Sequence, residues 1–218
     1  MSLQVKEIFR TIQGEGRWTG HPCTLVRLAG CNLRCAWCDT AYAYEGGKKY
    51  RLDRLARRIS GLGLDLVLVT GGEPLLQPET PALLQRLLEQ GAEVILETNG
   101  SLDISPVPQG AQVVLDLKCP GSGEQSRNLW KNLNRLTGAD EIKFVIADAG
   151  DYRWAKEQIK KRKLDRLAPV NLSPVSGRLD PAQLAQWMLR DKLRARLNLQ
   201  LHKIIWPLGS ELHFTHKA

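Results

Sequence analysis

The sequence lacks any segment that would place it in or across a membrane. No apolar run approaches the roughly 20 residues of a membrane span. The first residues, Met1-Ser-Leu-Gln-Val-Lys-Glu, do not show the charged and then apolar pattern of a signal peptide. Internal repeats, low-complexity segments and linker-like stretches are also missing. We therefore expect one domain over residues 1–218, with a short tail from about residue 207, and no membrane partner.

The sequence also has few cysteines, and their arrangement argues against disulfides. It contains five, an odd number, and three of them are concentrated in one short segment. A second C-x2-C pair is absent, as is a pair of histidines at zinc-finger spacing, although Cys23, Cys119 or His21 could complete a four-ligand zinc site. We expect a chain with free thiols in a reducing cytoplasm, and we treat Cys23 and Cys119 as bystanders.

Acidic residues are outnumbered by basic ones. There are 31 Lys and Arg against 23 Asp and Glu, a formal net charge of +8, and the excess lies mainly in residues 48–58, 156–166 and 190–203. Such a balance is compatible with an acidic protein, an anionic substrate or a nucleic acid. However, Leu52, Leu55, Ala56 and Ile59 form an apolar helical stripe that turns the neighbouring arginines to solvent. We therefore expect no nucleic-acid partner.

Short apolar runs alternate with helical patterns along the chain. The runs predicted as strands are residues 24–28, 64–69, 93–96, 112–117, 141–146, 170–172 and a longer mixed run, 197–205. Helices are predicted over 81–90, with Thr80 as a possible N-cap, over 151–164, and from Asp180-Pro181 toward Arg196. This alternation predicts a mostly parallel sheet with outer helices, either an open doubly wound sheet or a partial barrel.

A polar cluster follows nearly every predicted strand. In barrel and parallel α/β folds the carboxyl ends of strands form the working face, so we expect the clusters to meet around one site. They are Arg27 with the cysteine segment, Thr70-Gly71-Gly72-Glu73-Pro74, Glu97-Thr98-Asn99-Gly100, Asp116-Leu117-Lys118, Ser173-Pro174 and Gln200-Leu-His202-Lys203.

The most informative motif is the run Cys31-Asn-Leu-Arg-Cys35-Ala-Trp-Cys38. Thiolates hold iron–sulfur clusters, and three ligands on a four-iron cluster leave one iron without a protein ligand. This spacing resembles the radical S-adenosylmethionine (SAM) superfamily, whose members chelate SAM on that iron. The segment Thr70-Gly71-Gly72-Glu73-Pro74 is similar to the motif with which the superfamily holds the SAM amino group.

Further motifs resemble one family in particular, the 7-carboxy-7-deazaguanine synthases of queuosine and deazapurine biosynthesis. They are Phe9-Arg-Thr-Ile-Gln13-Gly-Glu15-Gly16, Arg27 and Gly30, Cys38-Asp39-Thr40-Ala-Tyr42, Glu97-Thr-Asn-Gly100 and Gln200-Leu-His202-Lys203. The resemblance implies an α/β fold, a modified partial TIM-like (β/α) barrel, in a homodimer. It implies a lyase that converts 6-carboxy-5,6,7,8-tetrahydropterin to 7-carboxy-7-deazaguanine, releasing ammonia and using SAM catalytically.

The resemblance also implies roles for individual residues. Cys31, Cys35 and Cys38 would hold a [4Fe–4S] cluster, and Thr40 would bind Mg²⁺, which prefers oxygen ligands. The residues implied for SAM are Trp37, Cys38, Asp39, Gly72, Glu97, Asp116, Leu117, Lys118 and Ser173. Those implied for the pterin are Ile12, Gln13, Gly14, Glu15, Arg27, Thr70 and His202, with the Arg27 guanidinium suited to the substrate carboxylate.

Two alternatives stay open. A glycyl-radical activating enzyme also carries C-x3-C-x2-C and a glycine motif but lacks the Thr11-Ile-Gln-Gly-Glu-Gly16 opening. A zinc-stabilised basic module that binds RNA would use the cysteines structurally. For the lyase, an acidic electron donor such as a flavodoxin would suit the basic surface.

Overall fold

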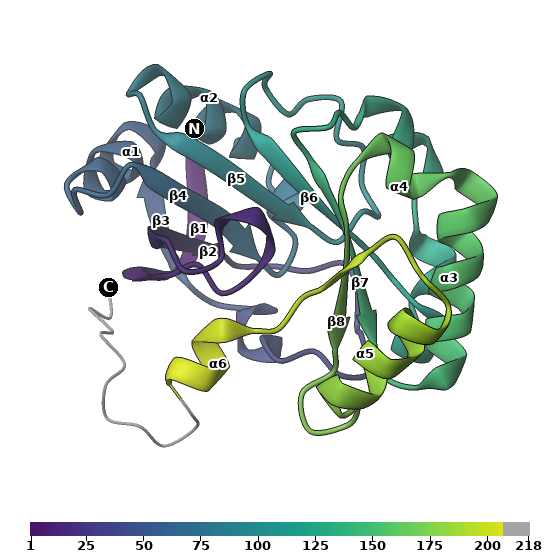
Figure 1. The fold of residues 1–218 in the computed structure, drawn as a ribbon. Helices are drawn as coiled ribbons and strands as arrows, with labels where there is room; N and C mark the ends of the chain where they lie inside the picture. Colours follow the sequence, from purple (N-terminus) through teal and green to yellow (C-terminus); the bar gives the residue numbers. More distant parts are fainter. Residues whose placement is uncertain (207–218) are drawn as a thin grey trace.

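The chain forms one nine-stranded sheet, seen in a computed structural model that describes residues 1–206. The strand order is β3-β1-β2-β4-β5-β6-β7-β8-β9 (Figure 1). The strands are β1 (Ser2–Ile12), β2 (Pro22–Leu28), β3 (Lys48–Arg51), β4 (Leu66–Gly71), β5 (Glu93–Thr98), β6 (Gln112–Leu117), β7 (Glu141–Ile146), β8 (Val170–Pro174) and β9 (Arg196–Leu197). The predicted tail from residue 207 lies outside the described residues.

The sheet is parallel from β2 to β9, and β1 pairs antiparallel with both β2 and β3. Strands β3 and β9 are the two edges of the sheet among the described residues, so the barrel is open. The predicted α/β fold, a modified partial TIM-like barrel, is confirmed.

Helices cover the outer face of the sheet. They are α1 (Leu52–Ser60), α2 (Thr80–Glu89), α3 (Ala149–Arg162), α4 (Leu164–Leu167) and α5 (Pro181–Arg190), and a last helix, α6 (Leu201–Ile205), follows β9. Figure 1 shows α1 and α2 beside β1 to β5, and α3 and α5 beside β7 and β8. The two main apolar cores lie between these helices and the sheet, one on each side of the β5–β6 boundary.

Successive side chains of a strand point to opposite faces of the sheet, so one set packs in these cores and the next set lies on the inner face. Phe144 of β7 is fully buried against the outer helices, whereas its neighbours Lys143 and Val145 line a cavity on the other side. A strand that is covered on both faces has a nearly continuous apolar sequence with isolated polar residues, and the parallel strands of this chain show that pattern.

Two helix predictions are confirmed at particular residues, although α5 ends at Arg190 and does not continue toward Arg196, which begins β9. The predicted stripe of α1, Leu52, Leu55, Ala56 and Ile59, comprises its buried residues. Helix α5 begins at Pro181, and the Asp180 carboxylate accepts a hydrogen bond from the Ala182 N–H at 2.9 Å. Such a cap satisfies one of the free N–H groups at a helix start.

Other boundaries differ from the predictions. Thr80 is the first residue of α2 rather than its cap, because its hydroxyl donates to the Pro74 carbonyl at 2.6 Å. Helix α3 begins at Ala149, capped by Asp148, and ends at Arg162 because Lys163 adopts a left-handed conformation. The predicted strand over 197–205 is wrong: β9 ends at Leu197 and α6 follows.

Candidate active site

A cavity of about 1030 Å³ lies against the inner face of the sheet. The polar clusters predicted to meet do so here, since residues from the carboxyl ends of β2, β4, β5, β6 and β8 all line it. The predicted site residues that line it are Ile12, Gln13, Gly14, Glu15, Arg27, Cys31, Cys35, Trp37, Cys38, Asp39, Thr40, Thr70, Gly72, Glu97, Asp116, Lys118, Ser173 and His202. Their individual roles stay predictions.

Leu117 is the exception among the predicted residues. It is fully buried in the outer core, and the alternation of β6 turns its side chain away from the side that Asp116 occupies. A contact between Leu117 and SAM would therefore have to use its backbone, and this role stays a prediction.

The cysteine segment forms a loop at one side of the cavity. Cys31, Cys35 and Cys38 are free, partly buried and line the same space. Two backbone hydrogen bonds hold the loop to residues 122–124: the Ala36 N–H donates to the Ser122 carbonyl at 3.0 Å, and the Arg34 N–H donates to the Glu124 carboxylate at 2.6 Å. Burial raises the pKa of the Cys31 and Cys35 thiols.

The three thiols fit an iron–sulfur cluster. Among residues 1–206, no three His, Cys, Asp or Glu side chains come close enough to hold a single metal ion. In a cubane cluster each thiolate binds a different iron, so three neighbouring thiols that line one cavity suit it.

The glycine motif packs directly against the start of the cysteine loop. The Gly72 N–H donates to the Leu28 carbonyl at 3.1 Å, and the Glu73 N–H donates to the Gly30 carbonyl at 2.8 Å. A Cβ atom at Gly72 would overlap the Gly30 carbonyl and lie 2.8 Å from Cβ of Cys31. Glycine is therefore required for the two backbones to approach this closely.

Glu73 lies beneath this junction and is fully buried. Its carboxylate accepts hydrogen bonds from the Leu75 N–H at 2.9 Å, the Thr98 hydroxyl at 2.8 Å and the Asn99 N–H at 2.7 Å. Burial nevertheless raises the pKa of Glu73. The glutamate thus ties the glycine motif to the end of β5.

Arg27 is held in place by two residues that the sequence did not identify as part of the site. Its Nε donates to the Glu7 carboxylate at 2.6 Å, and the Tyr42 hydroxyl donates to the same oxygen at 2.7 Å. Burial disfavours the charge, but Tyr42 and Glu7 together outweigh it and raise the pKa of Arg27. The guanidinium is therefore a permanent cation at the cavity wall.

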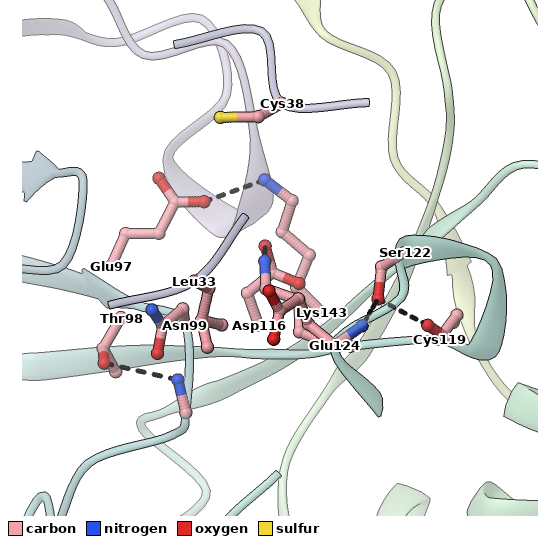
Figure 2. Close-up of polar contacts among 12 residues, drawn as sticks. Leu33, Cys38, Glu97, Thr98, Asn99, Asp116, Cys119, Ser122, Glu124 and Lys143 are labelled. Carbon is pink, nitrogen blue, oxygen red and sulfur yellow. Dashed lines mark hydrogen bonds and ion pairs between the residues drawn. The ribbon is translucent and has the colours of Figure 1, made fainter. Parts of the chain in front are cut away.

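Two lysines form ion pairs on the inner face. The Lys118 ammonium lies 2.9 Å from Oδ2 of Asp116, and Oδ1 of Asp116 has no hydrogen-bond partner among the described residues. The Lys143 ammonium lies 2.8 Å from Oε1 of Glu97, as Figure 2 shows. It also contacts the Glu15 carboxylate. Lys143 is the most central residue that sequence reasoning missed.

Helix α6 lies across the turn that carries Gln13, Gly14 and Glu15. The Leu201 N–H donates to the Gly14 carbonyl at 3.0 Å, and the His202 imidazole packs on the glycine where a Cβ would otherwise be. Lys203 adds an ion pair with Asp39 at 2.7 Å. The helix therefore joins the Gln13–Glu15 turn to the end of the cysteine loop.

A buried carboxylate supports the same turn from below. Glu141 is fully buried, and it accepts from the Arg17 N–H at 2.8 Å and lies 3.1 Å from Nη2 of Arg196. Asn198 accepts from the Gly16 N–H at 2.8 Å. These residues lie far apart in the sequence, so only the topology brings them together.

Comparison with known proteins identifies the family. Residues 25–118 match the Radical SAM superfamily. Two curated relatives named 7-carboxy-7-deazaguanine synthase, from Koribacter versatilis and Chlorobaculum tepidum, are each 42% identical over 94% of this chain, and the matches cover 97% and 94% of the relatives.

A solved structure shares the fold. It is the crystal structure of QueE from Escherichia coli, which is 24% identical over 93% of this chain and 95% of that chain, with a TM-score of 0.76. With the cysteine loop, the glycine motif and relatives that match nearly end to end, the chain belongs to the 7-carboxy-7-deazaguanine synthase family of radical SAM proteins.

Proposed function

We propose that this chain is a lyase that converts 6-carboxy-5,6,7,8-tetrahydropterin to 7-carboxy-7-deazaguanine with release of ammonia, using SAM catalytically. The observation that carries the proposal is the single cavity in which the three-cysteine loop faces Arg27, Glu15 and His202. The shared name of the relatives supports it, and favours it over glycyl-radical activation and over a zinc-stabilised RNA module.

Cys31, Cys35 and Cys38 would hold the [4Fe–4S] cluster. When bound, the cluster supplies one electron for cleavage of SAM to methionine and a 5′-deoxyadenosyl radical. Gly72 lines the cavity beside the loop, and its carbonyl would accept a hydrogen bond from the SAM amino group. The other residues proposed to contact SAM are Trp37, Asp39, Glu97, Asp116, Lys118 and Ser173.

The unpartnered oxygen of Asp116 supports its place in this set. Oδ1 is buried and accepts no hydrogen bond within residues 1–206, and such an orphan acceptor is costly unless a ligand donates to it. A hydroxyl of the SAM ribose is a donor of suitable chemistry. The Lys118 ammonium pairs with the other oxygen and so holds the carboxylate in place.

Arg27 would bind the pterin carboxylate. Its Nε is occupied by Glu7, which fixes the plane of the guanidinium and leaves its terminal N–H groups for the substrate. Ile12, Gln13, Gly14, Glu15, Thr70 and His202 would surround the ring. These residues would orient the pterin so that its C6 hydrogen faces the SAM side of the cavity, and such positioning would be the protein's main contribution to rate.

Thr40 is proposed as the Mg²⁺ ligand. Its hydroxyl lies 3.7 Å from the Cys38 sulfur, and Thr40 lines the cavity. The hard oxygen of a hydroxyl suits Mg²⁺.

The assembly and setting are part of the proposal. We propose one domain over residues 1–218, a homodimer, and an acidic electron donor such as a flavodoxin that meets the basic surface. The five free thiols favour a reducing cytoplasm. Among residues 1–206 no helix is long and apolar enough to span a membrane.

Anaerobic purification with reconstitution tests the proposed function. The expected protein is brown, contains iron, and forms 7-carboxy-7-deazaguanine and ammonia from the pterin and SAM, as measured by mass spectrometry. A colourless protein with stoichiometric zinc would contradict it. A brown protein that cleaves SAM but activates only a protein partner would instead support the glycyl-radical alternative.

A further inference from the structure

Lys143 is a buried lysine at the centre of the cavity wall. It projects from the inner face of β7, and its side chain is only 8% exposed. Its ammonium contacts the carboxylates of Glu15, from the loop after β1, and Glu97, from the end of β5, the latter at 2.8 Å. Figure 2 shows the Glu97–Lys143 pair, and Cys38 lines the same cavity. Three segments far apart in the sequence therefore meet at one nitrogen.

The positive charge of Lys143 affects the charge states of Glu15 and Glu97. Two buried carboxylates that share one site repel each other, and without a cation one of them would take up a proton. Burial, together with the nearby Glu97 carboxylate, raises the pKa of Glu15, and Lys143 opposes this shift. Glu97 has a lowered pKa because, against the effect of burial, Lys143 stabilises its charge.

The contacts also fix the orientation of both carboxylates. Lys143 binds Oε2 of Glu15 and Oε1 of Glu97, so it fixes one oxygen of each carboxylate. The other oxygen of Glu97 accepts from the Thr70 hydroxyl at 3.3 Å. A carboxylate held in this way presents its remaining acceptor in one direction, which preorganises it for a ligand rich in N–H groups.

We propose that Lys143 is a positioning residue for the pterin: its ammonium bridges Glu15 and Glu97 and thereby holds the Glu15 carboxylate in the orientation that accepts N–H hydrogen bonds from the ring. The inference rests on the proposed function. Lys143 acts through Glu15 and does not touch the reacting atoms.

The test compares Lys143→Met with the wild type in the reconstituted protein. We expect at least a tenfold rise in the dissociation constant for 6-carboxypterin, a fluorescent oxidised analogue, and a similar rise in KM for the pterin substrate. SAM cleavage, measured as 5′-deoxyadenosine, is followed in the same samples because Lys143 also contacts Glu97, and the proposal requires pterin binding to fall further than SAM cleavage does. Lys143→Arg, which keeps the cation, should recover part of the binding.

Lys131→Met is the matched control, because Lys131 pairs with Asp103 on the exposed surface, 3.0 Å away. It should bind the pterin as the wild type does. Wild-type binding by Lys143→Met would overturn the proposal. If the wild type itself neither binds nor converts the pterin, the proposed function fails, and the role of Lys143 fails with it.

A second pair of variants keeps the test decisive if Lys143→Met does not fold. Lys143→Met/Glu97→Gln removes the cation together with one carboxylate, so the site stays balanced, and it is compared with Glu97→Gln alone. If Lys143 orients Glu15, the lysine change should still weaken pterin binding at least fivefold in the Glu97→Gln background. Equal binding by the two variants would show that the lysine only compensates the charge of Glu97, and would overturn the proposal.

Discussion

The two faces of the sheet differ in function: one packs against the outer helices, and the other lines the cavity. Outward residues such as Leu115, Phe144 and Leu172 are fully buried among the helices, and the inward residues Asp116, Lys143 and Ser173 line the cavity. Each pair is separated by a single position along a strand. The stability of the fold is therefore concentrated on one face and its chemistry on the other, so substitutions on the two faces should have separable effects.

The largest expected effect is loss of the cluster. Cys35→Ala should abolish product formation and lower the iron content, because the thiolate is one of three proposed cluster ligands. Iron analysis and product formation by mass spectrometry measure this. The control is Cys119→Ala, a buried thiol of the outer core, which should keep its iron and lose only about 1–2 kcal/mol of unfolding free energy. Equal iron loss in both variants would contradict the assignment.

The glycine motif should be nearly as sensitive. In Gly72→Ala the new Cβ would overlap the Gly30 carbonyl, so the cysteine loop must shift, and we expect at least a hundredfold loss of SAM cleavage. Gly138→Ala is the matched control, because a Cβ there meets no atom within 4 Å. Release of 5′-deoxyadenosine measures both. Normal cleavage by Gly72→Ala would show that this contact is not needed.

Substitutions at two neighbouring residues of β7 test whether the outer face of the sheet contributes more to stability than the inner face does. Phe144→Ala should lower the free energy of unfolding by about 3–5 kcal/mol, because it leaves a cavity in the outer core. Val145→Ala, on the partly exposed inner face, should cost about 1 kcal/mol or less. Urea unfolding followed by circular dichroism gives both values, and equal losses would break the comparison.

The smallest expected effect concerns pH. Burial, with help from Lys203, lowers the pKa of His202. The unfolded chain, with a histidine pKa near 6.5, then binds the proton more readily, so this residue costs stability as pH falls through that range. Between pH 7.5 and 5.5 the free energy of unfolding should therefore fall by a few tenths of a kcal/mol less in His202→Gln than in the wild type. Urea unfolding at the two pH values measures it; an identical loss in the variant would refute the assignment.

The alternation of strands and helices was largely predictable, and so was the convergence of the strand ends. Apolar runs marked β4 to β8, and the stripe of α1 identified its buried face. Strand β1 was missed because charged residues such as Lys6, Glu7 and Arg10 interrupt its pattern. The short helix α6 was taken for a strand because its placement depends on a backbone contact with Gly14.

The cysteine loop and glycine motif were identifiable because their spacing is local. Lys143 was not, because a single lysine within an apolar strand gives no sign of its partners. Its role follows from Glu15, 128 positions away, and from Glu97, 46 positions away. Glu7 was missed for the same reason, since only the pairing of β1 with β2 brings it to Arg27.

The most direct test of the central claim is Arg27→Ala, an inward substitution that should leave the outer cores intact. The measurement is the rate of pterin conversion beside the rate of SAM cleavage in the same reconstituted sample. We predict at least a hundredfold loss of conversion, with 5′-deoxyadenosine still released and a circular dichroism spectrum that matches the wild type. Wild-type conversion of the pterin by this variant would contradict the account.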